Sequence, residues 1–381
     1  MAKSVIWDDL KHVRGRNETL DDLKRIRRST LTETHMLFKS LVLTGLLALS
    51  TITQPAIAAD HIGLKELTIA TKEPGRSLQT FVIYPAGDGG TKAIVGENRI
   101  ITGYEAWRDA PIAPGRHPLI LISHGSGGNV LGLSWLTTRL ASLGYIVVGP
   151  NHPGTMSGDS DPKRTVEVWH RPMDLSVTLD TLLADPALSA SIDATNIGAL
   201  GFSLGGYDVL ALVGAQQNRQ EFAQYCFSNA GATLGFCHWL VKGGVDLTAL
   251  DPRFEDNHRD PRIKAIVAVD PGFTPSFTDA SLKAVRTPVL FLNMGTPVST
   301  PGAVETHHLA ELIPGARLAR VPDAVHFSFL GLCKPDGAKF LEQIGDDPIC
   351  TDAGGRDRAA LHEDMLKATT AFLAEHLPVG K

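Results

Sequence analysis

The segment from Ile197 to Tyr207 constrains the fold more than any other part of the chain. It reads Ile-Gly-Ala-Leu-Gly-Phe-Ser-Leu-Gly-Gly-Tyr, and it places Ser203 between Gly201 and Gly205 where an apolar run gives way to a helix-permissive run. This G-x-S-x-G pattern is typical of a sharp strand-to-helix turn that exposes the serine Oγ at the edge of a sheet. Such a turn brings the backbone so close to itself that a Cβ at either glycine would clash. It also holds the serine in a sparsely populated conformation.

The pattern needs support from the rest of the chain, because glycine is abundant, at 37 of 381 residues. Chance alone gives about 0.2 matches in a chain of this length and composition. The alternative is a serine in an ordinary glycine-rich turn, and only the surrounding pattern can exclude it.

Apolar runs alternate with segments of helical periodicity along most of the chain. The predicted buried strands are 119–123, 145–149, 196–202, 263–269, 288–293 and 317–321, and the predicted helices are 131–143, 174–183, one from 204, 304–312 and 358–376. Two earlier segments, 64–70 and 80–84, alternate apolar and polar residues as half-buried antiparallel edge strands do. Strands alternating with helices predict an α/β fold with a mostly parallel sheet covered on both faces.

Two long stretches, 216–261 and 327–357, do not fit this alternation, and each carries two cysteines. Loops of this length inside a compact domain are usually lids or binding loops. We therefore expect both insertions to lie near the active site, at the rim of a substrate cleft. Surface decoration is the alternative.

The first 58 residues are expected to lie outside the folded domain. Residues 36–58 combine a short basic start, an apolar core over 41–53 and the triplet Ala56-Ile57-Ala58, which together form the pattern of a secretory signal cleaved after Ala58. The apolar core is too short for a comfortable permanent span. Residues 1–35 form an upstream extension, interpreted as a start assigned too early; a cytoplasmic extension before an uncleaved anchor is the alternative. The mature protein is then an exported single domain over 59–381.

Cysteine usage agrees with export. The four cysteines fall into two sequence-local pairs, which predict the disulfides Cys226–Cys237 and Cys333–Cys350. Four buried free thiols are the alternative, and the spacing argues against zinc. The net charge of −5 and the lack of a clustered basic face argue against nucleic-acid binding.

An activated serine requires a base and a third group that fixes the tautomer of the base. His326 lies between the last predicted strand and the last helix, where a loop can reach back over the serine. Asp270 ends strand 263–269 and is the predicted acid, because the loop after strand 288–293 contains no carboxylate. Asp323 is the alternative acid, although it lies only three residues before His326. A turn-capping role is the alternative for Asp270.

The segment His124-Gly-Ser-Gly-Gly128 directly follows strand 119–123. Its glycines, Gly125 and Gly127 among them, let the backbone pass close to a ligand. We expect the backbone N–H groups of Ser126 and Leu204 to stabilise a developing oxyanion.

Taken together, H-G-x-G-G, G-F-S-L-G-G, V-D-P-G-F and A-V-H-F resemble the secreted serine α/β-hydrolases near dienelactone hydrolases and platelet-activating-factor acetylhydrolases. The likeness spans about 64–377 and includes Asn151-His-Pro-Gly and Arg171-Pro-Met-Asp. It implies an α/β-hydrolase fold and an acid after the strand that follows the elbow helix, where Asp270 lies. Dienelactone hydrolases proper use a cysteine where this chain has Ser203, so lactone hydrolysis is not implied.

The expected activity is hydrolysis of a small or medium acyl ester through an acyl-enzyme, with neither cofactor nor metal. The alternatives are deacylation of lipid esters, peptide cleavage, and a non-catalytic binding protein. His152 ends a strand at the expected active edge and is a candidate pocket residue, as is Trp239; a structural role fits His152 equally well. An apolar groove for long acyl chains would come from the first insertion, which contains Phe222, Leu234, Phe236, Trp239 and Leu240.

Overall fold

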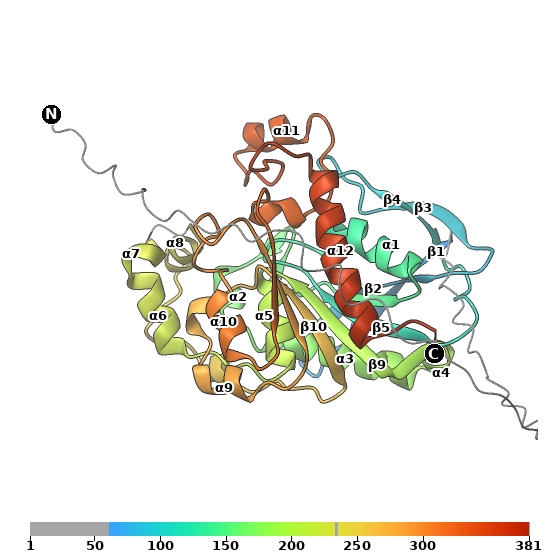
Figure 1. Ribbon diagram of the computed structural model, residues 1–381, viewed down its shortest axis with the longest axis horizontal. Helices are drawn as coiled ribbons and strands as arrows, with labels where there is room; N and C mark the ends of the chain where they lie inside the picture. Colours follow the sequence, from blue (N-terminus) through green and yellow to red (C-terminus); the bar gives the residue numbers. More distant parts are fainter. Residues whose placement is uncertain (1–60, 233–234, 381) are drawn as a thin grey trace, which may run out of the picture. The chain divides into compact units, whose positions relative to one another are not determined.

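Among the residues that the computed structural model describes, 61–232 and 235–380, ten strands form one sheet (Figure 1). Their order across the sheet is β12–β11–β10–β9–β5–β6–β2–β1–β4–β3. The bounds are β1 Ile62–Ala70, β2 Ser77–Pro85, β3 Thr91–Val95, β4 Tyr104–Arg108, β5 His117–Ser123, β6 Ile146–Pro150, β9 Ile192–Phe202, β10 Ile263–Val269, β11 Val289–Met294 and β12 Arg317–Val321. The six strands from β12 to β6 are parallel to one another, which confirms the predicted mostly parallel sheet. The predicted extension and signal, at 1–58, lie outside the described residues.

The sheet extends further than the sequence pattern indicated. Strands β1 and β2 were expected at an edge, yet β2 pairs with both β1 and β6, and β1 also pairs with β4. The edge strand is β3, which pairs with β4 alone. The edge prediction was wrong because β3 and β4 are only five residues long, are mostly exposed or half-buried, and give little periodic signal.

Helices cover both faces of the sheet, as predicted. Helices α1 (Ser134–Ser142) and α12 (Arg358–His376) pack on the face that receives Ile120, and α3 (His170–Ala184) and α5 (Leu204–Leu212) pack on the face that receives Leu121. Successive side chains of a strand point to opposite faces, so β5 supplies both cores. The remaining short elements are β7 Thr155–Met156, β8 Asp159–Ser160, α2 Pro162–Thr165, α4 Pro186–Ser189, α9 Asp279–Ala284 and α10 His307–Leu312.

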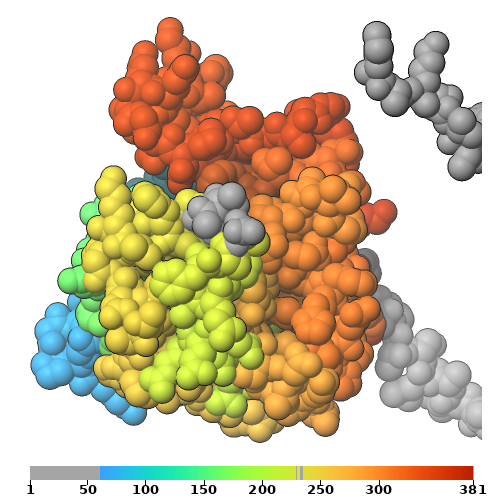
Figure 2. All heavy atoms as spheres, turned by 90° about the vertical axis from the view of Figure 1, so that its left-hand side faces the viewer, coloured from blue at the N-terminus to red at the C-terminus, as the bar shows by residue number. Residues whose placement is uncertain are grey.

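The first insertion contains helices rather than an irregular loop. These are α6 (Arg219–Phe227), α7 (Asn229–Ala232) and α8 (Gly235–Lys242), and a disulfide joins Cys226 on α6 to Cys237 on α8. In Figure 2 this insertion, in yellow-green, lies beside the orange segments that follow β10. The ring of Phe236 packs against Phe273, just after β10, with centroids 5.8 Å apart.

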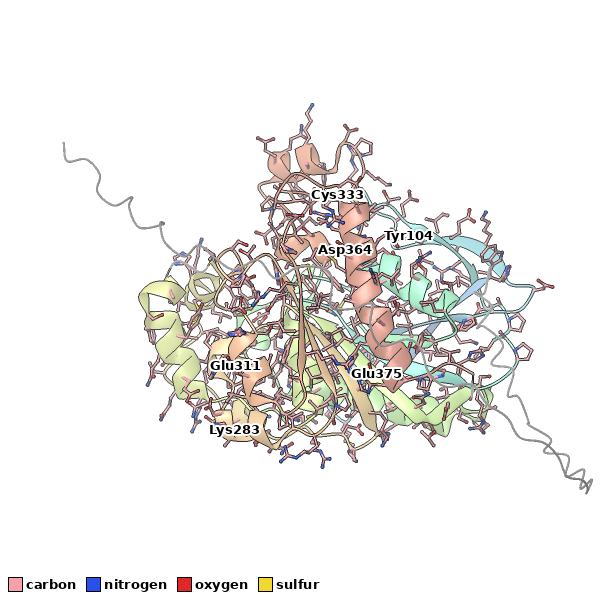
Figure 3. The ribbon with its side chains drawn as sticks, viewed as in Figure 1. Tyr104, Lys283, Glu311, Cys333, Asp364 and Glu375 are labelled. Carbon is pink, nitrogen blue, oxygen red and sulfur yellow. A yellow bond between two sulfur atoms is a disulfide. The ribbon has the colours of Figure 1, made fainter. Side chains whose placement is uncertain are left out.

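The second insertion begins at the 3-10 turn η4 (His326–Phe329) and continues through α11 (Gly337–Ile344) to the start of α12. A disulfide joins Cys333 to Cys350. Figure 3 shows Cys333 near the N-terminal end of α12, where Arg358 lies 3.7 Å from its sulfur. The disulfide thus closes the insertion next to the turn that carries His326.

Removal of both disulfides is expected to lower the melting temperature by roughly 5–10 °C, because each closed loop contributes about 3 kcal/mol. The loops span 11 and 17 residues. Calorimetry on the Cys226→Ala/Cys237→Ala and Cys333→Ala/Cys350→Ala proteins would measure each contribution separately. If a thiol titration shows all four cysteines to be free and the melting temperature is unchanged, both disulfide assignments are contradicted.

Candidate active site

Ser203 lies on the turn between β9 and α5, with φ 55° and ψ −118°. Positive φ is costly for a residue with a Cβ and persists only where the surroundings enforce it. Here the Ser203 N–H donates to the carbonyl of Val269 at 2.9 Å, and the Ser203 carbonyl accepts from Gly206 N at 2.9 Å and Gly272 N at 2.8 Å. These bonds fix both sides of the strained residue and keep its hydroxyl at the carboxyl edge of the sheet.

The flanking glycines are required by contact distances. A Cβ on Gly201 would lie 1.9 Å from the carbonyl oxygen of Gly205, and a Cβ on Gly205 would lie 2.1 Å from the carbonyl oxygen of Ser123. Real side chains never come this close to a backbone. The steric reason inferred from the sequence therefore applies at both positions.

His326 and Asp270 meet Ser203 in one hydrogen-bonded chain. His326 Nε2 lies 3.1 Å from Ser203 Oγ, and His326 Nδ1 lies 3.0 Å from Asp270 Oδ2. The Asp270 carboxylate is fully buried, whereas the His326 side chain is 21% exposed. Since a carboxylate only accepts, Nδ1 carries the imidazole proton, and Nε2 is left to accept the serine proton.

The second oxygen of Asp270 is held by two further donors. Asn293 Nδ2 donates to Asp270 Oδ1 at 2.8 Å, and Met294 N donates to the same oxygen at 2.9 Å. The Asn293 Oδ1 atom accepts from Thr306 Oγ1 at 2.5 Å, which orients the amide. The sequence analysis did not identify Asn293, although a polar residue near the end of an apolar strand was a visible signal.

The competing acid, Asp323, points elsewhere. Its side chain is 56% exposed and lies 4.0 Å from Arg356. Only Asp270, of these two carboxylates, contacts the imidazole of His326.

The turn that carries His326 is anchored by the second insertion and by α12. Ser328 Oγ accepts from Val325 N at 2.9 Å and donates to Asp352 Oδ1 at 2.6 Å, and Asp352 pairs with Arg358 at 3.1 Å. His362 Nε2 lies 2.9 Å from the carbonyl oxygen of Ser328.

His362 is expected to make stability depend on pH. It is buried, stacks on Trp135 at 3.7 Å, and burial lowers its pKa to about 4. Between about pH 4 and 6.5 the unfolded state binds more protons at this residue than the folded state, so stability falls as the pH drops through that window. The expected loss is at most about 3 kcal/mol. Denaturant unfolding at pH 7.5, 6 and 5 should show that the free energy of unfolding falls less in His362→Gln than in wild type. If the two proteins lose the same free energy of unfolding over this range, His362 is not the cause.

The loop that carries Ser126 lies near Ser203, and Leu204 directly follows Ser203 in the chain. A Cβ on Gly125, the residue before Ser126, would lie 3.1 Å from Ser203 Cβ. Within the described residues, neither Ser126 N nor Leu204 N donates to a protein acceptor. Gly127 adopts a positive φ of 69° and donates to the carbonyl of Thr155 at 2.9 Å.

A second serine–histidine–carboxylate contact lies beneath this loop. Ser123 Oγ lies 3.0 Å from His152 Nε2, and His152 Nδ1 lies 2.9 Å from Asp174 Oδ2. Ser123 and His152 have no exposed surface, so no substrate can reach this hydroxyl. This corrects the expectation that His152 lines the pocket: the ring is a fully buried structural group with polar partners at both nitrogens, and desolvation holds its pKa well below the usual value.

Two of the five residues proposed to line an apolar groove in the first insertion do not fit that role. Phe222 and Leu240 are core residues, exposed by 3% and 0%, so neither can line an open groove. Trp239 and Phe236 are half-buried and pack on each other with centroids 6.0 Å apart. Leu234 lies outside the described residues.

Two further properties concern the described part of the chain only. No group of three or more His, Cys, Asp or Glu side chains there is arranged to hold a metal ion. Nor does any helix of 61–232 or 235–380 combine the length and apolarity that crossing a membrane requires.

Comparisons with known proteins agree with this architecture. A ferulic acid esterase from Streptomyces cinnamoneus superposes with a TM-score of 0.57 and 20% identity, over 86% of this chain and 92% of the esterase. Lipase 1 from Moraxella sp. (strain TA144) is 35% identical over 80 residues, which are 21% of this chain and 22% of that lipase. No family model matches. The structural match confirms the predicted α/β-hydrolase fold.

Proposed function

We propose that this protein is a serine hydrolase that cleaves carboxylic esters through an acyl-enzyme. The observation that carries the proposal is the chain from Ser203 Oγ to His326 Nε2 and from His326 Nδ1 to Asp270 Oδ2. The strained turn presents the serine, and the His326 side chain is 21% exposed at the same edge.

Each group has a defined task in this mechanism. Ser203 Oγ attacks the acyl carbon while His326 Nε2 takes its proton, and Asp270 stabilises the imidazolium that forms. The N–H groups of Ser126 and Leu204 stabilise the oxyanion, an effect worth about 3–4 kcal/mol per donor. His326 then protonates the leaving alcohol, and water activated by the same imidazole releases the acid.

The names of the similar proteins, a ferulic acid esterase and a lipase, support an ester substrate. A lipid ester is the second candidate, because Phe227 on α6 and Val241 on α8 are 62% and 50% exposed on the disulfide-closed insertion. The narrower resemblance to dienelactone hydrolases and platelet-activating-factor acetylhydrolases remains a prediction, as does export after cleavage at Ala58. The two disulfides favour an oxidising compartment.

A series of p-nitrophenyl esters from acetate to laurate, with the matching p-nitroanilides, tests the activity. We expect a burst of p-nitrophenol close to one equivalent per enzyme, with anilides cleaved far more slowly. Preference for acetate or butyrate favours a soluble ester, and a rate that rises up to laurate favours lipid esters. Absence of turnover on every ester would contradict the proposal.

A further inference from the structure

A buried arginine lies directly behind the loop that carries Ser126. Arg171, near the start of α3, is 2% exposed and is among the largest fully buried side chains of the described region. Its Nη1 donates to Thr155 Oγ1 at 2.6 Å, and its Nη2 donates to Ser123 Oγ at 3.2 Å and to the carbonyl oxygen of His124. One planar guanidinium therefore reaches three points of two different segments.

These contacts lie at both ends of the loop. Ser123 and His124 immediately precede Gly125 and Ser126, and Thr155 accepts the N–H of Gly127 through its carbonyl at 2.9 Å. Any shift of the guanidinium would therefore move the backbone on each side of Ser126.

The same guanidinium is tied to the helix of the nucleophile. Arg171 Nε donates to Asp208 Oδ2 at 2.9 Å, and Asp208 lies on α5, which begins directly after Ser203. Ser123 Oγ donates to the same carboxylate oxygen at 2.5 Å. The Asp208 side chain is fully buried, and desolvation raises its pKa to about 6. The donor loop and the nucleophile helix thus share one ion pair.

The free-energy cost of burying these charges indicates that they position the backbone rather than add stability. Burying an ion pair adds little net stability, and apolar residues of similar volume often serve as well or better. A second buried pair, Arg76 with Asp174 at 2.5 Å, continues the network through His152. Several charged groups are thus buried where they fix two short segments of backbone.

We infer that Arg171, held by Asp208, is a positioning residue for the oxyanion loop and sets the position of the Ser126 N–H relative to Ser203. This inference rests on the proposed function. Arg171 does not touch substrate; it acts through the His124 carbonyl and through Thr155.

Arg171→Lys tests the inference, because it retains the positive charge opposite Asp208 but loses the planar guanidinium. The single ammonium group of lysine cannot reach both His124 and Thr155 in the same way. We expect kcat to fall about 30–300-fold, a range approaching the loss of one oxyanion donor, with KM changed less than threefold. Thr155→Val removes one anchor alone and should lower kcat about 3–10-fold. It also provides a test if the lysine variant does not fold.

The inhibition constant of a trifluoromethyl ketone distinguishes positioning of the Ser126 N–H from a general structural role of Arg171. Its adduct with serine is a tetrahedral oxyanion, so its inhibition constant should rise by the same factor as kcat/KM falls. Inhibition by the free carboxylic acid should stay within threefold. Arg262→Lys is the matched control, since Arg262 also pairs with a carboxylate, Asp260, at 2.6 Å but lies just before β10, at the opposite edge of the sheet from the loop. Its kcat should be that of wild type.

The inference is overturned if Arg171→Lys or Thr155→Val keeps kcat and ketone affinity within twofold of wild type. It is also overturned if kcat and acid binding fall together, as a general loss of folded enzyme would cause. Failure of the proposed function is distinguishable, because wild-type enzyme would then neither turn over an ester nor bind the ketone.

Discussion

Replacement of Ser203 with alanine is expected to lower kcat for p-nitrophenyl esters by about 10⁶-fold. The change removes only Oγ, the atom that lies 3.1 Å from His326 Nε2 and forms the acyl bond in the proposed mechanism. The backbone bonds of residue 203 involve its N–H and carbonyl alone and are retained. The melting temperature should therefore stay within about 2 °C of wild type. The burst phase, measured on enzyme titrated for active sites, should disappear.

Ser123→Ala is the informative comparison, because it makes the same change in the other serine–histidine contact. It disturbs the network around Arg171, so we expect a reduced kcat, but the burst should still reach about one equivalent. Loss of the burst in Ser123→Ala, or its survival in Ser203→Ala, would contradict the assignment of the nucleophile.

Replacement of Asp270 with asparagine is expected to lower kcat about 10⁴-fold at neutral pH with little change in KM. The carboxylate accepts the Nδ1 proton of His326 at 3.0 Å, and an amide nitrogen in its place favours the other tautomer. Nε2 would then carry a proton and could not accept one from Ser203. Because the side-chain volume is conserved and Asn293 can still donate to the remaining oxygen, we expect the variant to fold.

Asp323→Asn is the matched control, since it neutralises a carboxylate only three residues from His326. Asp323 is exposed and pairs with Arg356, so kcat should remain within twofold of wild type. More than a tenth of wild-type kcat in Asp270→Asn, or a large loss in Asp323→Asn, would show that the acid had been misassigned. Steady-state kinetics on wild type, the two single variants and the double variant decides whether Asp270 or Asp323 is the acid.

Chain order and strand ends were sufficient to predict which three side chains would meet at one edge of the sheet, Ser203, His326 and Asp270. Ser203 could be located from its two glycines, and Asp270 and His326 from their places after predicted strands, because the carboxyl ends of parallel strands meet at one edge of the sheet. The parallel strands themselves were predicted because their apolar runs are continuous, as in the fully buried β5.

The rest depends on contacts that no local pattern encodes. Asn293 and Arg171 act through partners 23 and 37 residues away, Asp270 and Asp208, and sequence alone does not identify such partners. The pocket role expected for His152 was wrong because the ring is fully buried, with the Asp174 carboxylate of α3 against Nδ1 and the His124 ring 5.1 Å away between centroids. The helices of the first insertion were missed because a disulfide and a small aromatic core, rather than regular periodicity, hold them in place.

Labelling with a fluorophosphonate, followed by intact-mass measurement and peptide mapping, tests the central claim most directly. The account predicts one adduct per chain, on the peptide that contains Ser203, and no adduct in Ser203→Ala. Wild-type protein that remains unlabelled, or an adduct that persists in Ser203→Ala, would contradict it.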